Sequence, residues 1–176
     1  LHQYQKGIKY YDDALSILGG LHSPTQTMIR CNYNKGYAYA ALEDHASAIQ
    51  SYEKALELIQ QINPDYSHIV SLCHHLIADS YYSLQQYDSA LSHYQKSMEL
   101  LLDYEPQRMQ EITDLCVSIG RTCFYQGYYK DAEKFFINAR KLYKKMNKDK
   151  VLININSKRY TIISCVVCGL LIAAGF

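Results

Sequence analysis

The sequence predicts an all-α protein built as a solenoid of antiparallel helix hairpins. A small residue recurs at Ala14, Ala48, Ala90 and Ala132. The last three positions are evenly spaced along the chain, and the interval between the first two is shorter. Leucine or an aromatic residue follows each of them four positions later, and these spacings are helical. The chain has 18 tyrosines, four phenylalanines and no tryptophan, which indicates that its tyrosines are placed by a repeat. Self-similarity at a fixed period is typical of stacked supersecondary units.

Each predicted unit brings a small residue of its first helix against an aromatic residue of its second. A small side chain lets two backbones approach, and the aromatic ring fills the space beside it. A large residue at Gly36 or Gly120 is therefore expected to force the helices apart. The predicted repeat-packing residues are Gly36, Tyr39, Ala48, Tyr52, Ala55, Ala78, Tyr81, Ala90, Tyr94, Gly120, Ala132, Phe136 and Ala139.

The elements follow from this register and from the three prolines. Ser23-Pro24 and Asn63-Pro64 each combine an N-cap residue with a proline suited to the first helical position, and Pro106 follows Pro64 by the same step that separates Ala90 from Ala48. Gly19-Gly20 is expected to end a partial first unit. The predicted helices span residues 24–43, 46–62, 64–84, 88–104, 106–126 and 130–147. Together they form an array over 1–147, with units at about 1–22, 24–62, 64–104 and 106–147.

The pattern stops at the C-terminal end of the chain, which divides into a basic neck at 148–160 and an apolar tail at 161–176. The tail carries no charge, and as a helix it would be about 24 Å long against roughly 30 Å of hydrocarbon. Three interpretations stay open: a membrane anchor, a cap on the exposed end of the solenoid, and an unstructured or mistranslated end.

Composition excludes several classes of function. Lys plus Arg is 18 against 17 for Asp plus Glu, so no overall field favours nucleic acid. Six cysteines without a secretion signal favour reduced thiols in the cytoplasm, with membrane association only through the tail. The sequence contains no phosphate-binding glycine loop, and its adjacent histidines His74 and His75 point about 100° apart on a helix. We therefore expect no metal site, no cofactor and no enzymatic activity.

The order of small residue, aromatic, alanine, aromatic and alanine resembles the tetratricopeptide repeat family over residues 4–147. Asn32, His74 and Cys116 stand where the family usually has tryptophan. The 42-residue step is similar to the longer repeats of kinesin light chains and Leu-Gly-Asn-type polarity adaptors, and bacterial peptide-sensing regulators use similar long repeats. The resemblance implies a right-handed superhelix whose first helices line an inner groove for a peptide or a partner helix.

Carrying the family's inward positions onto this chain predicts a groove rich in aromatic residues. The expected function is a non-catalytic adaptor that binds a protein or peptide; the alternatives are a peptide-sensing bacterial regulator and a tail-anchored membrane receptor. Some relatives grip acidic chaperone C-termini with a carboxylate clamp of Lys and Asn, and an acid inside this groove argues against that ligand. The predicted groove residues are Arg30, Tyr33, Asn34, Tyr37, His75, Asp79, Tyr82, Arg121, Phe124 and Tyr125.

Overall fold

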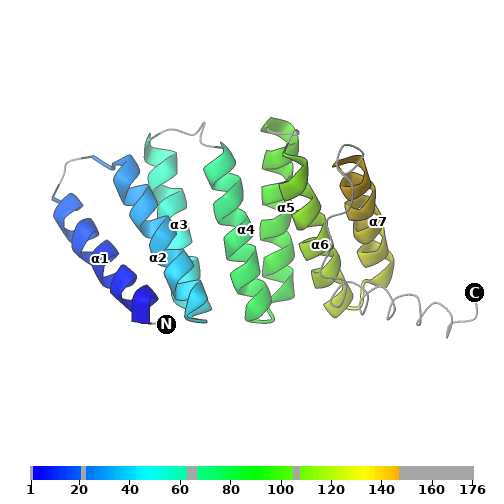
Figure 1. The fold of residues 1–176 in the computed structure, drawn as a ribbon, viewed down its shortest axis with the longest axis horizontal. Coiled ribbons are helices and arrows are strands. Elements are labelled where there is room, and N and C mark those ends of the chain that lie inside the picture. Colours follow the sequence, from blue (N-terminus) through cyan, green and yellow to red (C-terminus); the bar gives the residue numbers. More distant parts are fainter. Residues whose placement is uncertain (1, 21–22, 63–66, 105–107, 147–176) are drawn as a thin grey trace, which may run out of the picture. The chain divides into compact units, whose positions relative to one another are not determined.

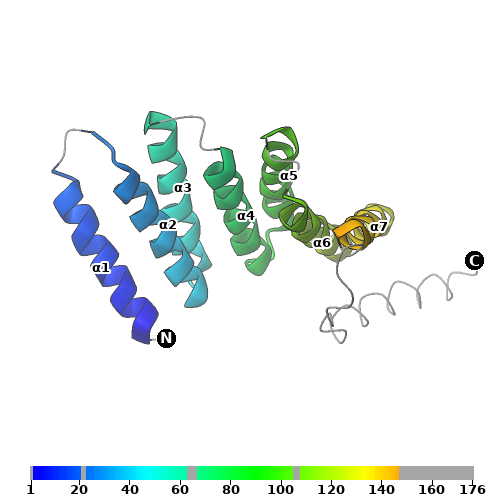
Figure 2. The same ribbon diagram turned by 45° about the horizontal axis from the view of Figure 1, so that its top comes forward.

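The protein is all-helical over the residues that the computed structural model describes, which are 2–20, 23–62, 67–104 and 108–146. Within these ranges there are seven α-helices and no strand. They are α1 His2–Leu18, α2 Gln26–Ala41, α3 His45–Ile62, α4 Ser67–Ser83, α5 Tyr87–Tyr104, α6 Met109–Tyr125 and α7 Tyr129–Met146. Helices α1 to α6 contact one another in chain order, and successive helices run in opposite directions (Figures 1 and 2). The predicted fold class, a solenoid of helix hairpins, is confirmed.

Three hairpins are complete: α2 with α3, α4 with α5, and α6 with α7. A Cβ atom built on Gly36 of α2 would lie 2.6 Å from the Tyr52 ring of α3, and one built on Gly120 of α6 would lie 2.8 Å from the Phe136 ring of α7. Ala78 and Tyr94, at the same positions of the middle hairpin, are both fully buried in one cluster. Helix α1 takes the place of a second helix and has no fully buried residue.

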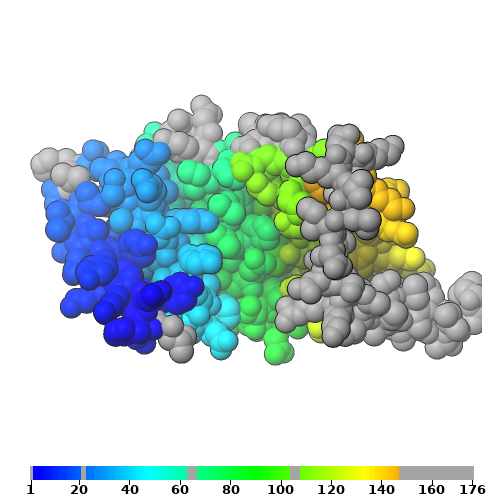
Figure 3. Space-filling view, in the orientation of Figure 1, coloured from blue at the N-terminus to red at the C-terminus, as the bar shows by residue number. Residues whose placement is uncertain are grey.

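The core consists of apolar clusters within and between the hairpins rather than one central cluster. One cluster joins Leu115 and Ile119 of α6 to Tyr94 of α5, and others join α2 and α3 to Cys73 and Ile77 of α4. Side chains fill the spaces between the ribbons of α1 to α5 (Figure 3). Each hairpin therefore depends on its neighbours for burial, as expected of a repeat array.

The same turn ends the first helix of every hairpin. Glu43 and Gln85 have φ angles of 63° and 60°, Gly127 has φ 82°, and these three positions are equivalent in the repeat. In each case the following amide donates to a carbonyl five residues back, as Asp44 does to Tyr39 at 3.0 Å. This bond pattern is a Schellman motif, which needs a left-handed residue and favours glycine there.

We expect Gln85→Gly to raise the free energy of unfolding by about 1 kcal/mol, because a left-handed conformation is unfavourable for a residue with a Cβ atom. Gly127→Gln should lower it by about the same amount. Urea denaturation followed by far-UV circular dichroism measures both. A Gln85→Gly protein less stable than the wild type would contradict the interpretation of this turn.

Two helices start two to three residues later than predicted. Helix α2 begins at Gln26 rather than residue 24, because the Thr25 hydroxyl, not Ser23, accepts the Met28 amide at 3.3 Å. Helix α6 begins at Met109 rather than 106, since Arg108 is non-helical with ψ 56°. The predicted caps at Asn63-Pro64 and Glu105-Pro106 lie outside the described residues, as do the neck at 148–160 and the tail at 161–176. No helix in the described part of the chain is both long and apolar enough to cross a membrane.

Candidate functional site

The candidate site lies on the first helices α2, α4 and α6, and its residues form two groups. One group surrounds a pocket between α2, α3 and α4, to which Tyr37 and Asp79 belong. The other is an aromatic group where α4, α5 and α6 meet, to which Tyr82 and Tyr125 belong. Tyr37 and Tyr125 are 55% and 61% exposed, so each group presents a tyrosine to solvent.

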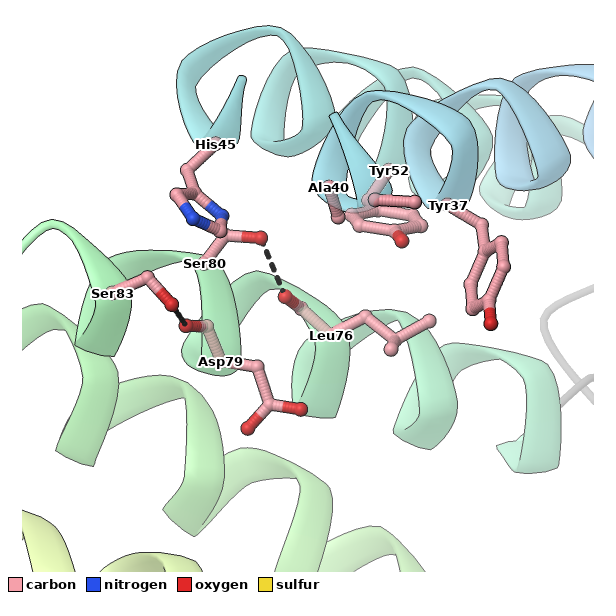
Figure 4. Close-up of a pocket in the computed structure, with 9 residues that line it drawn as sticks. Tyr37, Ala40, His45, Tyr52, Leu76, Asp79, Ser80 and Ser83 are labelled. Atoms are coloured by element: carbon pink, nitrogen blue, oxygen red, sulfur yellow. Dashed lines mark hydrogen bonds between the residues drawn. The ribbon is translucent and has the colours of Figure 1, made fainter. Parts of the chain in front are cut away.

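The pocket has a volume of about 200 Å³ and mixes apolar walls with a few polar groups (Figure 4). The Ser80 and Ser83 hydroxyls are already engaged, since they donate to the carbonyls of Leu76 and Asp79 at 2.9 and 3.0 Å. Its lining residues are Tyr37, Ala40, Ala41, His45, Tyr52, Leu76, Asp79, Ser80 and Ser83.

Asp79 is the acidic group of the pocket and also connects two helices. Its Oδ1 accepts the hydroxyl of Tyr94 on α5 at 2.5 Å, and its Oδ2 lies 3.7 Å from Nε2 of His75. Burial raises the pKa of Tyr94, and the Asp79 carboxylate raises it further, so the phenol stays protonated and donates. The Asp79 side chain is still 48% exposed and has free acceptor capacity.

The aromatic group is built around a stacked cation. The Arg121 guanidinium carbon lies 4.6 Å from the Tyr82 ring centroid, a cation–π geometry. Tyr125 meets the edge of Tyr82 at 5.9 Å, and Phe124 packs edge-on against Tyr125. Arg121 Nε is buried without a hydrogen-bond partner among the described residues. Arg121 thus lies on the half-buried Tyr82 ring, which the exposed Tyr125 ring adjoins.

Second helices also contribute residues to both groups, and these residues were not predicted as groove residues. Tyr87, at the start of α5, stacks on Tyr125 at 5.9 Å and 14°, and Tyr129, at the start of α7, meets Phe124 at 5.4 Å. His45 and Tyr52 come from α3. The inward positions of the family lie on first helices only, so they could not indicate residues of second helices. The tyrosines at the starts of α5 and α7 were the sequence feature that could have indicated Tyr87 and Tyr129.

The remaining predicted groove residues lie on α2. Arg30 is exposed, Asn34 is half-buried, and Tyr33 packs with its ring 6.0 Å from that of Tyr52. Tyr33 also borders two buried clusters, so it contributes to packing.

Most repeat-packing residues are in the interior. Tyr39, Tyr81 and Phe136 are half-buried and pack against buried clusters. The buried ones are Gly36, Ala48, Tyr52, Ala55, Ala78, Ala90, Tyr94, Gly120, Ala132 and Ala139.

The structure pairs His74 not with His75 but with His93 of α5, their Nδ1 atoms 3.1 Å apart. Burial lowers the pKa of His74 to about 4, with smaller contributions from His93 and Lys96, and it lowers that of His93 too. The Tyr81 ring also packs on His93, with the ring centroids 5.6 Å apart. The pair is therefore neutral at pH 7 and holds α4 against α5.

We expect the free energy of unfolding to fall as pH drops from 6.5 toward 4. The histidines of the unfolded chain take up protons near pH 6.5, whereas His74 in the folded chain does so only near pH 4. The folded state is therefore at its full stability above pH 6.5 and loses stability between pH 6.5 and 4. The loss should be on the order of 1–2 kcal/mol after solvent screening. Urea denaturation at pH 7.5 and 5.0 measures it.

Lys96→Met is the matched variant, since removing that positive charge should raise both histidine pKa values and flatten the pH dependence. A free energy of unfolding that is the same for the wild type at pH 7.5 and at pH 5.0 would contradict this role for the pair.

Buried thiols add no reactive group to the site. Burial raises the pKa of Cys73 to about 12 and raises those of Cys31, Cys116 and Cys123. These thiols therefore stay protonated at pH 7 and behave as small core residues. Cys165 and Cys168 lie outside the described residues.

Stacked antiparallel helix hairpins define a helical repeat protein. The sequence model of the tetratricopeptide repeat family matches residues 27–103, which run from α2 to α5. Over this span the chain matches tetratricopeptide repeats. No curated protein matches the sequence.

Solved structures show the same fold at low sequence identity. BtubC (BKLC) from P. vanneervenii is 18% identical with a TM-score of 0.77, and the match covers 88% of this chain and 61% of that one. The apo form of RapI is 20% identical with a TM-score of 0.70, covering 81% and 38%. MamA is 16% identical with a TM-score of 0.63, covering 86% and 70%. The chain thus spans about three fifths of the length of BtubC and about two fifths of that of RapI.

Proposed function

We propose that this chain is a non-catalytic adaptor that binds an extended peptide or a helix of a partner protein across α2, α4 and α6. The observation that carries the proposal is the pair of site groups on these helices. An acidic pocket around Asp79 lies on α4, and a ring-lined arginine lies on α6, with the exposed Tyr37 and Tyr125 beside them. Tyrosine and arginine are the side chains most enriched at binding hot spots.

The fold supports the same proposal. Tetratricopeptide repeats are generally scaffolds that bind proteins, and repeat solenoids offer extended binding surfaces. The affinity should be on the order of micromolar, since ordering a short peptide opposes binding. We also propose that the 42-residue repeat places this chain among the long-repeat adaptors.

A second candidate function is a peptide-sensing regulator. It is favoured by the likeness to the Rap conjugation gene regulator of plasmid pLS20, whose structure contains the Phr* peptide. That match has a TM-score of 0.63 at 19% identity and covers 80% of this chain and 38% of that protein. A peptide that binds this chain and changes the affinity of the chain for a second protein would favour the regulator. A peptide that binds without changing that affinity would favour the adaptor.

The test selects peptides from a random 12-residue phage library on the wild-type chain and measures their affinities by fluorescence anisotropy. Arg121→Gln combined with Tyr125→Ser should weaken the selected peptides at least tenfold, because it removes the cation and the exposed ring while leaving Tyr82 in its packing.

Tyr10→Ser on α1 is the matched control, because it removes an equally exposed tyrosine, 68% accessible, from a second helix. It should leave the affinities unchanged. Peptides that bind the double variant as tightly as the wild type, or that lose as much affinity with Tyr10→Ser, would place binding elsewhere and exclude the proposed surface.

A further inference from the structure

The Tyr52 hydroxyl is a buried polar group without a partner. Tyr52 is fully buried and lines the pocket, and its Oη makes no hydrogen bond within the described residues. Leaving a buried hydroxyl unpaired destabilises the folded chain, because the group loses its hydrogen bonds to water. The last hairpin shows that this position does not need the hydroxyl, since Phe136 occupies it there.

The repeat explains why this one phenol is unpaired. Tyr94 stands one repeat after Tyr52 and donates to Asp79 on the facing helix. The residue one repeat before Asp79 is Tyr37, which offers no carboxylate to Tyr52. Tyr52 therefore keeps the ring that the hairpin needs together with a polar atom that the hairpin does not use. A side chain that carries a polar group which the fold does not use is expected at functional positions.

The rest of the pocket is suited to a cation. His45 Nδ1 is a second buried atom in the lining without a partner among the described residues. Asp79 supplies a negative charge, and no lysine or arginine is among the described lining residues. The negative charge of Asp79 also acts on the Tyr52 phenol, whose pKa is raised first by burial and further by nearby groups including this carboxylate. Tyr52, His45 and Asp79 all line the pocket, the first two from α3 and Asp79 from α4 (Figure 4).

We propose that this pocket receives the side chain of an arginine or lysine from the bound peptide. The cation would pair with the Asp79 carboxylate and donate to the Tyr52 hydroxyl, while its aliphatic stem would lie along Ala40, Leu76 and the Tyr37 ring. About 200 Å³ is below the ~300–1,000 Å³ of typical small-molecule sites, and it fits a single long side chain. This inference rests on the proposed function and names the chemistry that the groove recognises.

The experiment titrates the ¹⁵N-labelled full chain with N-acetyl-arginine N-methylamide at 150 mM NaCl and follows amide shifts by NMR. We expect saturable shifts at Ala40, Ala41 and Ser80, and at least tenfold weaker binding of the citrulline analogue, which has the same shape without the charge. Asp79→Asn should weaken the arginine probe at least tenfold, and Tyr52→Phe several-fold.

Two controls separate the pocket from general attraction. Tyr94→Phe removes the internal hydrogen bond to Asp79 but keeps its charge, so it should not weaken the probe. Asp114→Asn removes an exposed carboxylate of α6 that lies outside the pocket, and it should have no effect.

Several results would overturn the inference: no saturable shift, equal binding of the arginine and citrulline probes, or full binding by Asp79→Asn. Failure here is distinguishable from failure of the adaptor function. The selected peptides could depend on Arg121 and Tyr125, carry no basic residue and bind Asp79→Asn as tightly as the wild type. That result would support the adaptor function and show that this pocket takes no part in it.

Discussion

Leucine at Gly36 should abolish cooperative unfolding of the chain, and alanine there should lower the free energy of unfolding by about 1–3 kcal/mol. A Cβ atom at this position would lie 2.6, 2.7 and 2.9 Å from three atoms of the Tyr52 ring. Tyr52 is fully buried, so its ring cannot shift without disturbing the side chains packed around it. The two helices of the hairpin would have to separate, and buried apolar contacts of α3 with α4 would be lost with them. Urea denaturation followed by circular dichroism measures the effect.

Gly7→Ala is the matched control because Gly7 also lies inside a helix, but its Cβ atom would meet only Tyr11 at an ordinary 3.7 Å. That substitution should stabilise the chain by about 0.5–1 kcal/mol through helix propensity. Opposite signs for Gly7→Ala and Gly36→Ala would separate packing from propensity. A stabilising Gly36→Ala would contradict the close helix approach.

The contact can also be tested by compensation. Tyr52→Leu removes the ring that the new Cβ atom meets, so the double substitution with Gly36→Ala should cost less than the sum of the two single ones. Gly120→Ala should destabilise less than Gly36→Ala, since the Phe136 ring lies farther away, at 2.8 Å, and is only partly buried. Strict additivity of Gly36→Ala and Tyr52→Leu would mean that the two residues do not press on each other.

The sequence predicts the helices well because the small and aromatic residues of each repeat recur at a fixed spacing. Gly36, Tyr52 and their counterparts recur at the same place in each repeat, and helical spacing leaves little freedom in how such a hairpin folds. Helix starts are less predictable, because Ser23 and Thr25 are both good N-caps and only the path of the chain selects Thr25. The left-handed turn at Gln85 gives no composition signal, since tertiary packing imposes it on a residue that does not favour it.

The candidate site is predictable only in part, because its polar partners come from different helices. Asp79 and Arg121 follow from the family's inward positions. The Tyr94 bond to Asp79 and the His74–His93 contact instead depend on how far α5 is rotated against α4. The unpaired Tyr52 hydroxyl cannot be inferred from residue type at all, since Tyr52 and Tyr94 occupy the same place in their repeats. It becomes visible only when the facing residues, Tyr37 and Asp79, are compared in space.

Alanine at Tyr94 should lower the free energy of unfolding by about 3–5 kcal/mol, because it empties a fully buried position between α4, α5 and α6. Alanine at Tyr52 should cost a similar amount. Phenylalanine is expected to distinguish the two sites. Tyr94→Phe removes a hydrogen bond to a carboxylate and should cost about 1.5–3 kcal/mol, whereas Tyr52→Phe removes a hydroxyl without an internal partner and should be neutral or stabilising.

The contrast between these two phenylalanine variants links stability to function, and urea denaturation at pH 7.5 measures both. A hydroxyl that adds nothing to folding, in a pocket that also holds an acidic side chain, is a group whose partner comes from another molecule. Tyr52→Phe should therefore keep or raise the stability of the chain while it weakens binding of the arginine probe. If Tyr52→Phe instead destabilised the chain as much as Tyr94→Phe does, the Tyr52 hydroxyl would have a structural partner, and the pocket would lose the group that we assign to the ligand.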